Sequence, residues 1–91
     1  MNLIKMNGDK VELRKDNGSY IRTITDKAVS AQLNASGDLV VVTKTDGKVE
    51  LRKDNGSYIR TITDKAKEAR FNNTDIAVTK IDGKVRSKSV V

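Results

Sequence analysis

The chain contains the same block of nineteen residues twice. The block KVELRKDNGSYIRTITDKA fills positions 10–28 and again positions 48–66, 38 residues later. The residues after each block also align, since Ala31 corresponds to Ala69 and Leu33 to Phe71. An internal repeat of this length is typical of proteins that stack similar units in a solenoid or around a ring. The repeat therefore constrains the fold more than any other feature of the chain.

Each repeat unit reads as four short strands, at positions 30–34, 39–44, 48–52 and 58–63. Runs of this length between Asn-Gly and Asp-Gly pairs are typical of antiparallel hairpins. We predict an all-β fold of antiparallel four-stranded meanders joined by two-residue type I′ turns, although Gly8-Asp9 supports its hairpin less well. The residues of the four other turns are Asn17, Gly18, Asp46, Gly47, Asn55, Gly56, Asp82 and Gly83.

A helix is the alternative for residues 25–33 and 65–71, because the second of these segments is rich in helix-forming residues. The first segment lacks most of the charged residues of the second but keeps Ala31 and Leu33 in the same positions. Those two residues alternate with polar ones, which favours a strand.

The apolar residues predict which strand faces are buried. Val49 and Leu51 alternate with charged residues, so the strand at 48–52 is expected to bury one face. The run at 39–42, Leu-Val-Val-Val, is apolar throughout, so both faces of that strand should be covered. A meander covered on both sides must lie between two similar sheets.

The combination of four short strands, a small polar loop before the second strand, Asp-Gly before the third and Asn-Gly before the fourth resembles a β-propeller repeat of the broad WD40-like kind. The segment Asn-Gly-Ser-Tyr-Ile-Arg-Thr-Ile is similar to short propeller repeats of prokaryotic and phage proteins. The Trp-Asp and Gly-His pairs of eukaryotic WD40 repeats are absent. The resemblance implies blades at 1–28 (incomplete), 29–65 (complete) and 66–91 (incomplete) within a single repeat domain.

The chain is short for a self-sufficient core. Only 36% of its 91 residues are hydrophobic, and it has no cysteine to form disulfides. Ten strands cannot close a ring of four-stranded blades, so we expect a homo-oligomer, either a dimer or a trimer, with six blades. Mixed blades with strands from two chains would complete the sheets at both ends.

Eighteen basic and twelve acidic residues give the chain a net charge of +6. Basic residues that recur in both blocks are candidates for contact with nucleic acid or another polyanion. Alternatively, Arg22 and Arg60 pair with Glu12 and Glu50 on the neighbouring strand. The six candidates are Arg14, Lys15, Arg22, Arg52, Lys53 and Arg60.

Catalysis and metal binding have little support in the residue types. The chain has no histidine or cysteine, so it lacks the usual general base near neutral pH and the usual zinc ligands. The loops at 15–19 and 53–57 lack the ligand spacing of a calcium-binding EF-hand and read as hairpin turns. We expect no enzyme activity, no metal and no cofactor.

Three interpretations of function remain open. The first is a structural or interaction module that binds its own copies and a protein partner, and the second is a basic ring that binds a polyanion. The third is a designed or ancestral-like propeller fragment with no biological ligand, which the near-perfect repeat allows. Tyr20 and Tyr58 are expected to pack their rings on a neighbouring unit, with sugar binding as the alternative. Neither a signal peptide nor a membrane span is predicted, so we expect the cytoplasm of a bacterium or of a virus-infected cell.

Overall fold

The computed structural model describes residues 2–72 and 75–89, and within these ranges the chain forms ten strands and no helix. The prediction of an all-β antiparallel fold is confirmed. The helical alternative is wrong, because β4 and β8 occupy the two segments concerned. The strands are β1 (Asn2–Asn7), β2 (Lys10–Lys15), β3 (Tyr20–Thr25), β4 (Ala28–Leu33), β5 (Leu39–Lys44), β6 (Val49–Lys53), β7 (Tyr58–Thr63), β8 (Ala66–Asn72), β9 (Asp75–Lys80) and β10 (Val85–Ser89).

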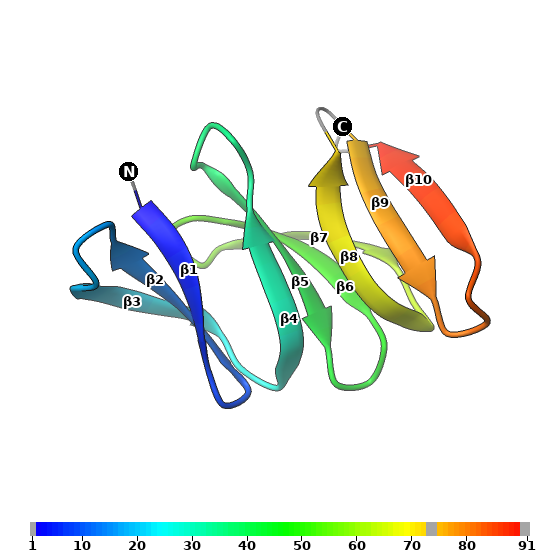
Figure 1. Ribbon diagram of the computed structural model, residues 1–91, viewed down its shortest axis with the longest axis horizontal. Helices are drawn as coiled ribbons and strands as arrows, with labels where there is room; N and C mark the ends of the chain where they lie inside the picture. Colours follow the sequence, from blue (N-terminus) through cyan, green and yellow to red (C-terminus); the bar gives the residue numbers. More distant parts are fainter. Residues whose placement is uncertain (1, 73–74, 90–91) are drawn as a thin grey trace.

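The strands form three antiparallel sheets that follow one another along the long axis of the molecule (Figure 1). Sheet 1 has the order β1-β2-β3, sheet 2 the order β4-β5-β6-β7, and sheet 3 the order β8-β9-β10. Strand β4 contacts both β1 and β8, so the first strands of the three sheets lie in one row. The middle sheet therefore has four strands among the described residues, and each end sheet has three.

The four predicted hairpins are present, but the predicted turn type is wrong. At the first of them, Gly18 N donates to Lys15 O and Lys15 N donates to Ser19 O, so the loop has three residues. Gly18 has a φ of 91°, whereas Asn17 has no positive φ, although a type I′ turn requires one at both central residues. The geometry matches a turn closed by a glycine bulge, in which only the last loop residue needs the left-handed region. The other three hairpins repeat these hydrogen bonds.

Two hydrophobic clusters hold the stack together, one on each face of the middle sheet. Val40 and Val42 pack with Val11 and Leu13 of sheet 1. Val41, between them on β5, points the other way and packs with the core of sheet 3. The three valines are fully buried. This confirms that β5 is covered on both faces, as its unbroken apolar run predicts.

The outer face of sheet 3 is more polar than the matching face of sheet 2. Ile76 and Val78 face sheet 2, so Asp75 and Ala77 on the same strand face away from it. The register places Asp75 where sheet 2 has Leu39, and Ser87 where it has Leu51.

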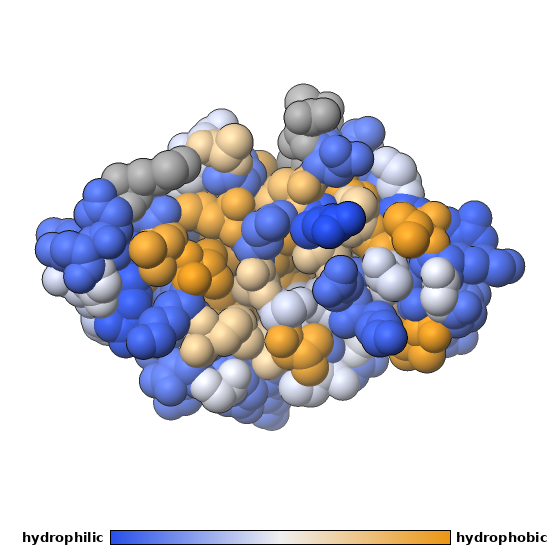
Figure 2. All heavy atoms as spheres, in the orientation of Figure 1, coloured by the Kyte–Doolittle hydropathy of each residue, from blue (hydrophilic) through white to orange (hydrophobic). Residues whose placement is uncertain are grey.

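The outer face of sheet 1 is also more polar than the matching face of sheet 2. Lys5 occupies the position that Val42 has in sheet 2. Hydrophilic side chains accordingly cover both ends of the molecule in Figure 2. Within a single chain, no further described sheet covers either outer face.

Two hydroxyl groups are buried without a hydrogen-bond partner among the described residues, those of Ser30 and Thr43. Thr43 is fully buried, and valine has nearly the same shape. We expect Thr43→Val to raise the free energy of unfolding by about 1 kcal/mol, because it removes an unpaired buried polar group. Urea denaturation measures this change, and Thr45→Val in the neighbouring exposed turn is the control. A loss of stability in Thr43→Val would contradict the assignment.

Candidate functional site

The repeated block builds the same polar cluster on sheets 1 and 2. In sheet 1, Arg14 donates to the carboxylate of Glu12 through Nε at 3.0 Å and Nη2 at 2.7 Å. Its Nη1 donates to Gly18 O at 2.8 Å. The guanidinium lies 5.7 Å from the centre of the Tyr20 ring, within the range of a cation–π contact. The Tyr20 hydroxyl is 3.0 Å from Thr23 Oγ1, so five groups of one hairpin hold each other in place.

The second copy repeats this arrangement residue by residue. Arg52 pairs with Glu50 at 3.0 Å and donates to Gly56 O, while its guanidinium lies 5.7 Å from the ring of Tyr58. The Tyr58 hydroxyl is 2.7 Å from Thr61 Oγ1. Identical sequence therefore gives closely similar local geometry in two different environments.

The surroundings of the two clusters differ. Glu12 lies opposite Lys5, so the first cluster is on the outer face of sheet 1. Glu50 lies opposite Val42, so the second cluster faces sheet 1. A β-carbon on Gly56 would lie 3.4 Å from Ile24 O, so the turn of the second cluster abuts β3.

Three of the six predicted polyanion contacts are already engaged within the protein. Arg14 and Arg52 are held by ion pairs and carbonyl groups, and Arg60 donates to Ser89 O at 2.6 Å. The six basic residues are not gathered in one place. Arg14 and Lys15 lie on β2, Arg22 on β3, Arg52 and Lys53 on β6, and Arg60 on β7.

The predicted pairing of Arg22 with Glu12, and of Arg60 with Glu50, is wrong. Glu12 lies opposite Thr23, and Arg22 lies opposite Leu13. The register shifts because Ile24 and Ile21 are extra residues in β3 without a partner in β2. Glutamate instead binds the arginine two positions later on its own strand, on the same face.

The tyrosine prediction also needs correction. Tyr20 and Tyr58 remain 55% and 53% exposed, so neither ring is buried against a neighbouring sheet. Each ring lies beside an arginine of its own sheet. The spacing of six residues between arginine and tyrosine across an Asn-Gly turn is the sequence signal that could have indicated this contact.

The hydrogen bonds from Arg14, followed by that from Asn7, lower the pKa of Glu12 below its ordinary value. A carboxylate with a lowered folded-state pKa stabilises the fold above its unfolded-state pKa, and this contribution is lost as the pH falls through the folded-state pKa. We expect Glu12→Gln to be clearly less stable than the parent protein at about pH 6, and we expect the difference to be smaller at about pH 2, because protonation of the parent carboxylate removes its contribution. Urea denaturation at both pH values tests this, and a constant difference would contradict it.

Residues 2–72 and 75–89 contain no group of three or more His, Cys, Asp or Glu residues placed to hold a metal ion. No helix long and apolar enough to cross a membrane occurs in the same residues. Comparison with known proteins adds no assignment, since no protein-family model and no curated protein sequence matches the chain.

Proposed function

We propose that the protein is a non-enzymatic interaction module whose three sheets close into a ring with a second copy. Twice three sheets make six, which is a common number of blades in the β-propellers that the repeat resembles. A ring of this kind offers a central opening and an outer rim as binding surfaces for a protein partner. The partner itself has no signature in the chain.

The main support for the proposal is that the middle sheet is covered on both faces, whereas each end sheet is covered on only one. Sheet 2 has an apolar cluster on each face, whereas sheets 1 and 3 each have one on a single face. The outer face of sheet 3 still carries Val85, which is 67% exposed, and that of sheet 1 carries Leu3, which is 39% exposed. A contact between these two faces would repeat the stacking found twice within the chain.

Face-to-face stacking of intact sheets is a better way to close the ring than the mixed blades, with strands from two chains, that the strand order led us to expect. Strand β8 already pairs with β9, and β3 pairs with β2. A mixed blade would require one of these ladders to open, while stacking leaves every ladder intact. We therefore favour a dimer of three-sheet units over a trimer.

The closing contact would be partly ionic. On sheet 3 the outer face carries the two acidic residues Asp75 and Glu68 and one basic residue, Arg70, which lies opposite Ala77. On sheet 1 the outer face carries Lys5. Exposed charges attract weakly and are screened by salt. The dimer should therefore dissociate as the salt concentration rises.

Light scattering after size-exclusion chromatography tests the proposal. We expect about 20 kDa, twice the chain mass of 10.0 kDa, in low salt, and a shift toward the monomer at about 1 M salt. Lys5→Glu should weaken the dimer. Lys48→Glu, which makes the same charge change in a turn away from both outer faces, should not. A 10 kDa mass at every protein and salt concentration would overturn the proposal.

A further inference from the structure

We propose that the free edge of β10 binds an extended acidic peptide as an additional strand of sheet 3. The site is an edge rather than a face, so the proposal does not depend on ring closure. Strand addition to a sheet edge is a common mode of peptide recognition, in which main-chain hydrogen bonds provide affinity and side chains provide specificity.

The position of the site follows from the equivalence of β6 and β10. Val49 lies opposite Thr43 in sheet 2, and Val85 lies opposite Thr79 in sheet 3. The far edge of β6 is paired with β7, whereas no described strand pairs with the far edge of β10. A strand bound there would take the place that β7 has in the middle sheet.

The charges on β10 differ from those of the repeat at the two positions that form the glutamate–arginine ion pair of the polar cluster. Arg86 stands where the repeat has Glu12 and Glu50, and Lys88 stands where it has Arg14 and Arg52. The ion pair of the polar cluster is thus replaced by two cations. Neither of them forms an ion pair with a described carboxylate.

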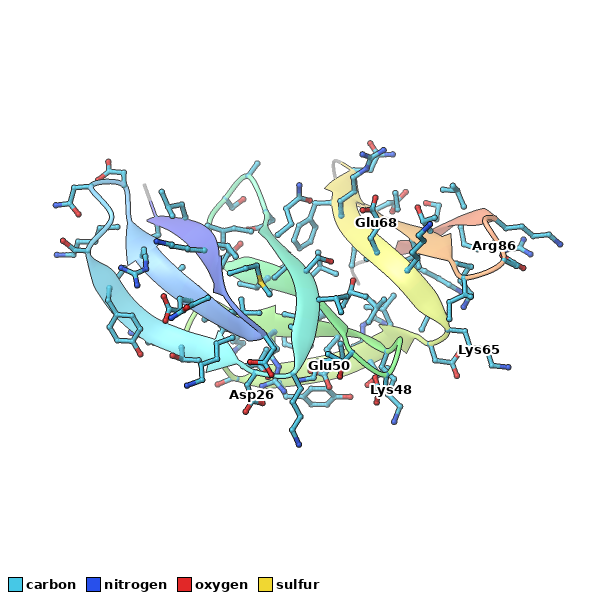
Figure 3. All side chains as sticks on the ribbon, turned by 60° about the horizontal axis from the view of Figure 1, so that its bottom comes forward. Asp26, Lys48, Glu50, Lys65, Glu68 and Arg86 are labelled. Carbon is cyan, nitrogen blue, oxygen red and sulfur yellow. The ribbon has the colours of Figure 1, made fainter. Side chains whose placement is uncertain are left out.

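A third cation lies beside them. Arg86 and Lys88 lie opposite Val78 and Ile76, so they are on the face of sheet 3 that faces sheet 2. Arg60 of β7 reaches from sheet 2 to Ser89 O at the end of β10. Figure 3 shows Arg86 on β10 at the end of the stack, apart from Glu50 in the middle sheet. The edge with which no described strand pairs is therefore bordered by positive charge.

The chemistry of the occupant follows from the register of β7. Tyr58 lies opposite Arg52, and Thr61 lies opposite Glu50. An equivalent strand beside β10 would place its residues i and i+3 opposite Lys88 and Arg86. Acidic residues at these positions form cross-strand pairs of opposite charge. The same cations disfavour pairing of β10 with another β10, because like charges on an edge repel.

The test uses a fluorescein-labelled peptide with the sequence of residues 57–63 in which aspartate replaces Tyr58 and Thr61. We expect it to bind the whole protein, and to bind at least about tenfold more tightly than the same peptide without the aspartates, by fluorescence anisotropy. Amide hydrogen exchange should show new protection in β10. Arg86→Glu with Lys88→Glu should abolish binding of the acidic peptide and allow binding of a peptide with lysine at the two positions.

Matched controls distinguish binding of the acidic peptide at β10 from general attraction of the peptide to a basic protein. Arg22→Glu, an exposed cation on β3, should leave the affinity unchanged, and circular dichroism checks that each variant folds. Equal affinity for the peptides with and without aspartate would overturn the proposal. So would tighter binding of single-stranded RNA at the same edge, or protection of strands other than β10.

Discussion

Replacement of Leu51 by alanine is expected to lower the free energy of unfolding by about 2–5 kcal/mol. The Leu51 side chain is 1% exposed and lies in the cluster that joins sheets 2 and 3, with Val41 and Ile76. Truncation removes buried methyl groups and leaves a cavity between two sheets that cannot easily move together. For a domain whose total stability is typically about 5–15 kcal/mol, the loss is large. Urea denaturation followed by circular dichroism measures it.

The repeat supplies matched controls for this substitution. Leu13 is the same residue of the repeat in sheet 1 and is 2% exposed, so Leu13→Ala should cause a similar loss. Ser87 occupies the equivalent place in sheet 3 on the exposed outer face, so Ser87→Ala should change stability by less than about 0.5 kcal/mol. A similar loss in Leu51→Ala and Ser87→Ala would contradict the assignment of inner and outer faces.

The strands and their buried faces were predictable because they depend on local patterns. The alternation around Val49 and the unbroken apolar run at 39–42 encode, within a few residues, which faces meet a neighbouring sheet. The repeat then predicts that the arrangement recurs. The sheets at the ends were harder to judge, because their polar outer faces become visible only when Asp75 and Ser87 are aligned in register with Leu39 and Leu51.

The turns and the polar clusters were less predictable because they depend on register. An Asn-Gly pair suits a two-residue turn and also a three-residue loop with glycine last, and only the pairing of Lys15 with Ser19 distinguishes them. The unpaired residue Ile21 lies between the turn and Arg22, so that Arg22 lies opposite Leu13 and not opposite Glu12. Residue types alone therefore identified the charged groups of the candidate site but not their partners.

The connections between sheets include a lysine that no motif in the sequence singles out. Lys44 Nζ donates to Thr25 Oγ1 at 2.9 Å and to Asp26 O, so it ties β5 to the chain leaving sheet 1. The next residue at this corner, Lys27, has a φ of 52°, in the region that L-residues rarely adopt. Thr45 N donates to Lys27 O at 2.8 Å and fixes the strained residue from the other side.

The second corner has the same construction between sheets 2 and 3. Lys80 Nζ donates to Thr63 Oγ1 at 3.0 Å and to Asp64 O. Lys65, labelled in Figure 3 at this corner, has a φ of 50°. Sheet 1 has Asn7 at the position of Lys44 and Lys80, and its side chain binds Glu12 instead. The lysine thus belongs to the joint between consecutive sheets.

Lys44→Met should therefore lower the free energy of unfolding by about 1.5–3 kcal/mol, because two acceptors of the corner lose a charged donor. Lys80→Met should act similarly, and Lys48→Met, at an exposed turn position, is the control. Hydrogen exchange should place the new local opening in Lys44→Met at residues 25–28, and in Lys80→Met at residues 63–66. If the corner is held mainly by its backbone bonds, all three variants would unfold at the same urea concentration, and the side-chain ammonium groups would have no part in joining the sheets.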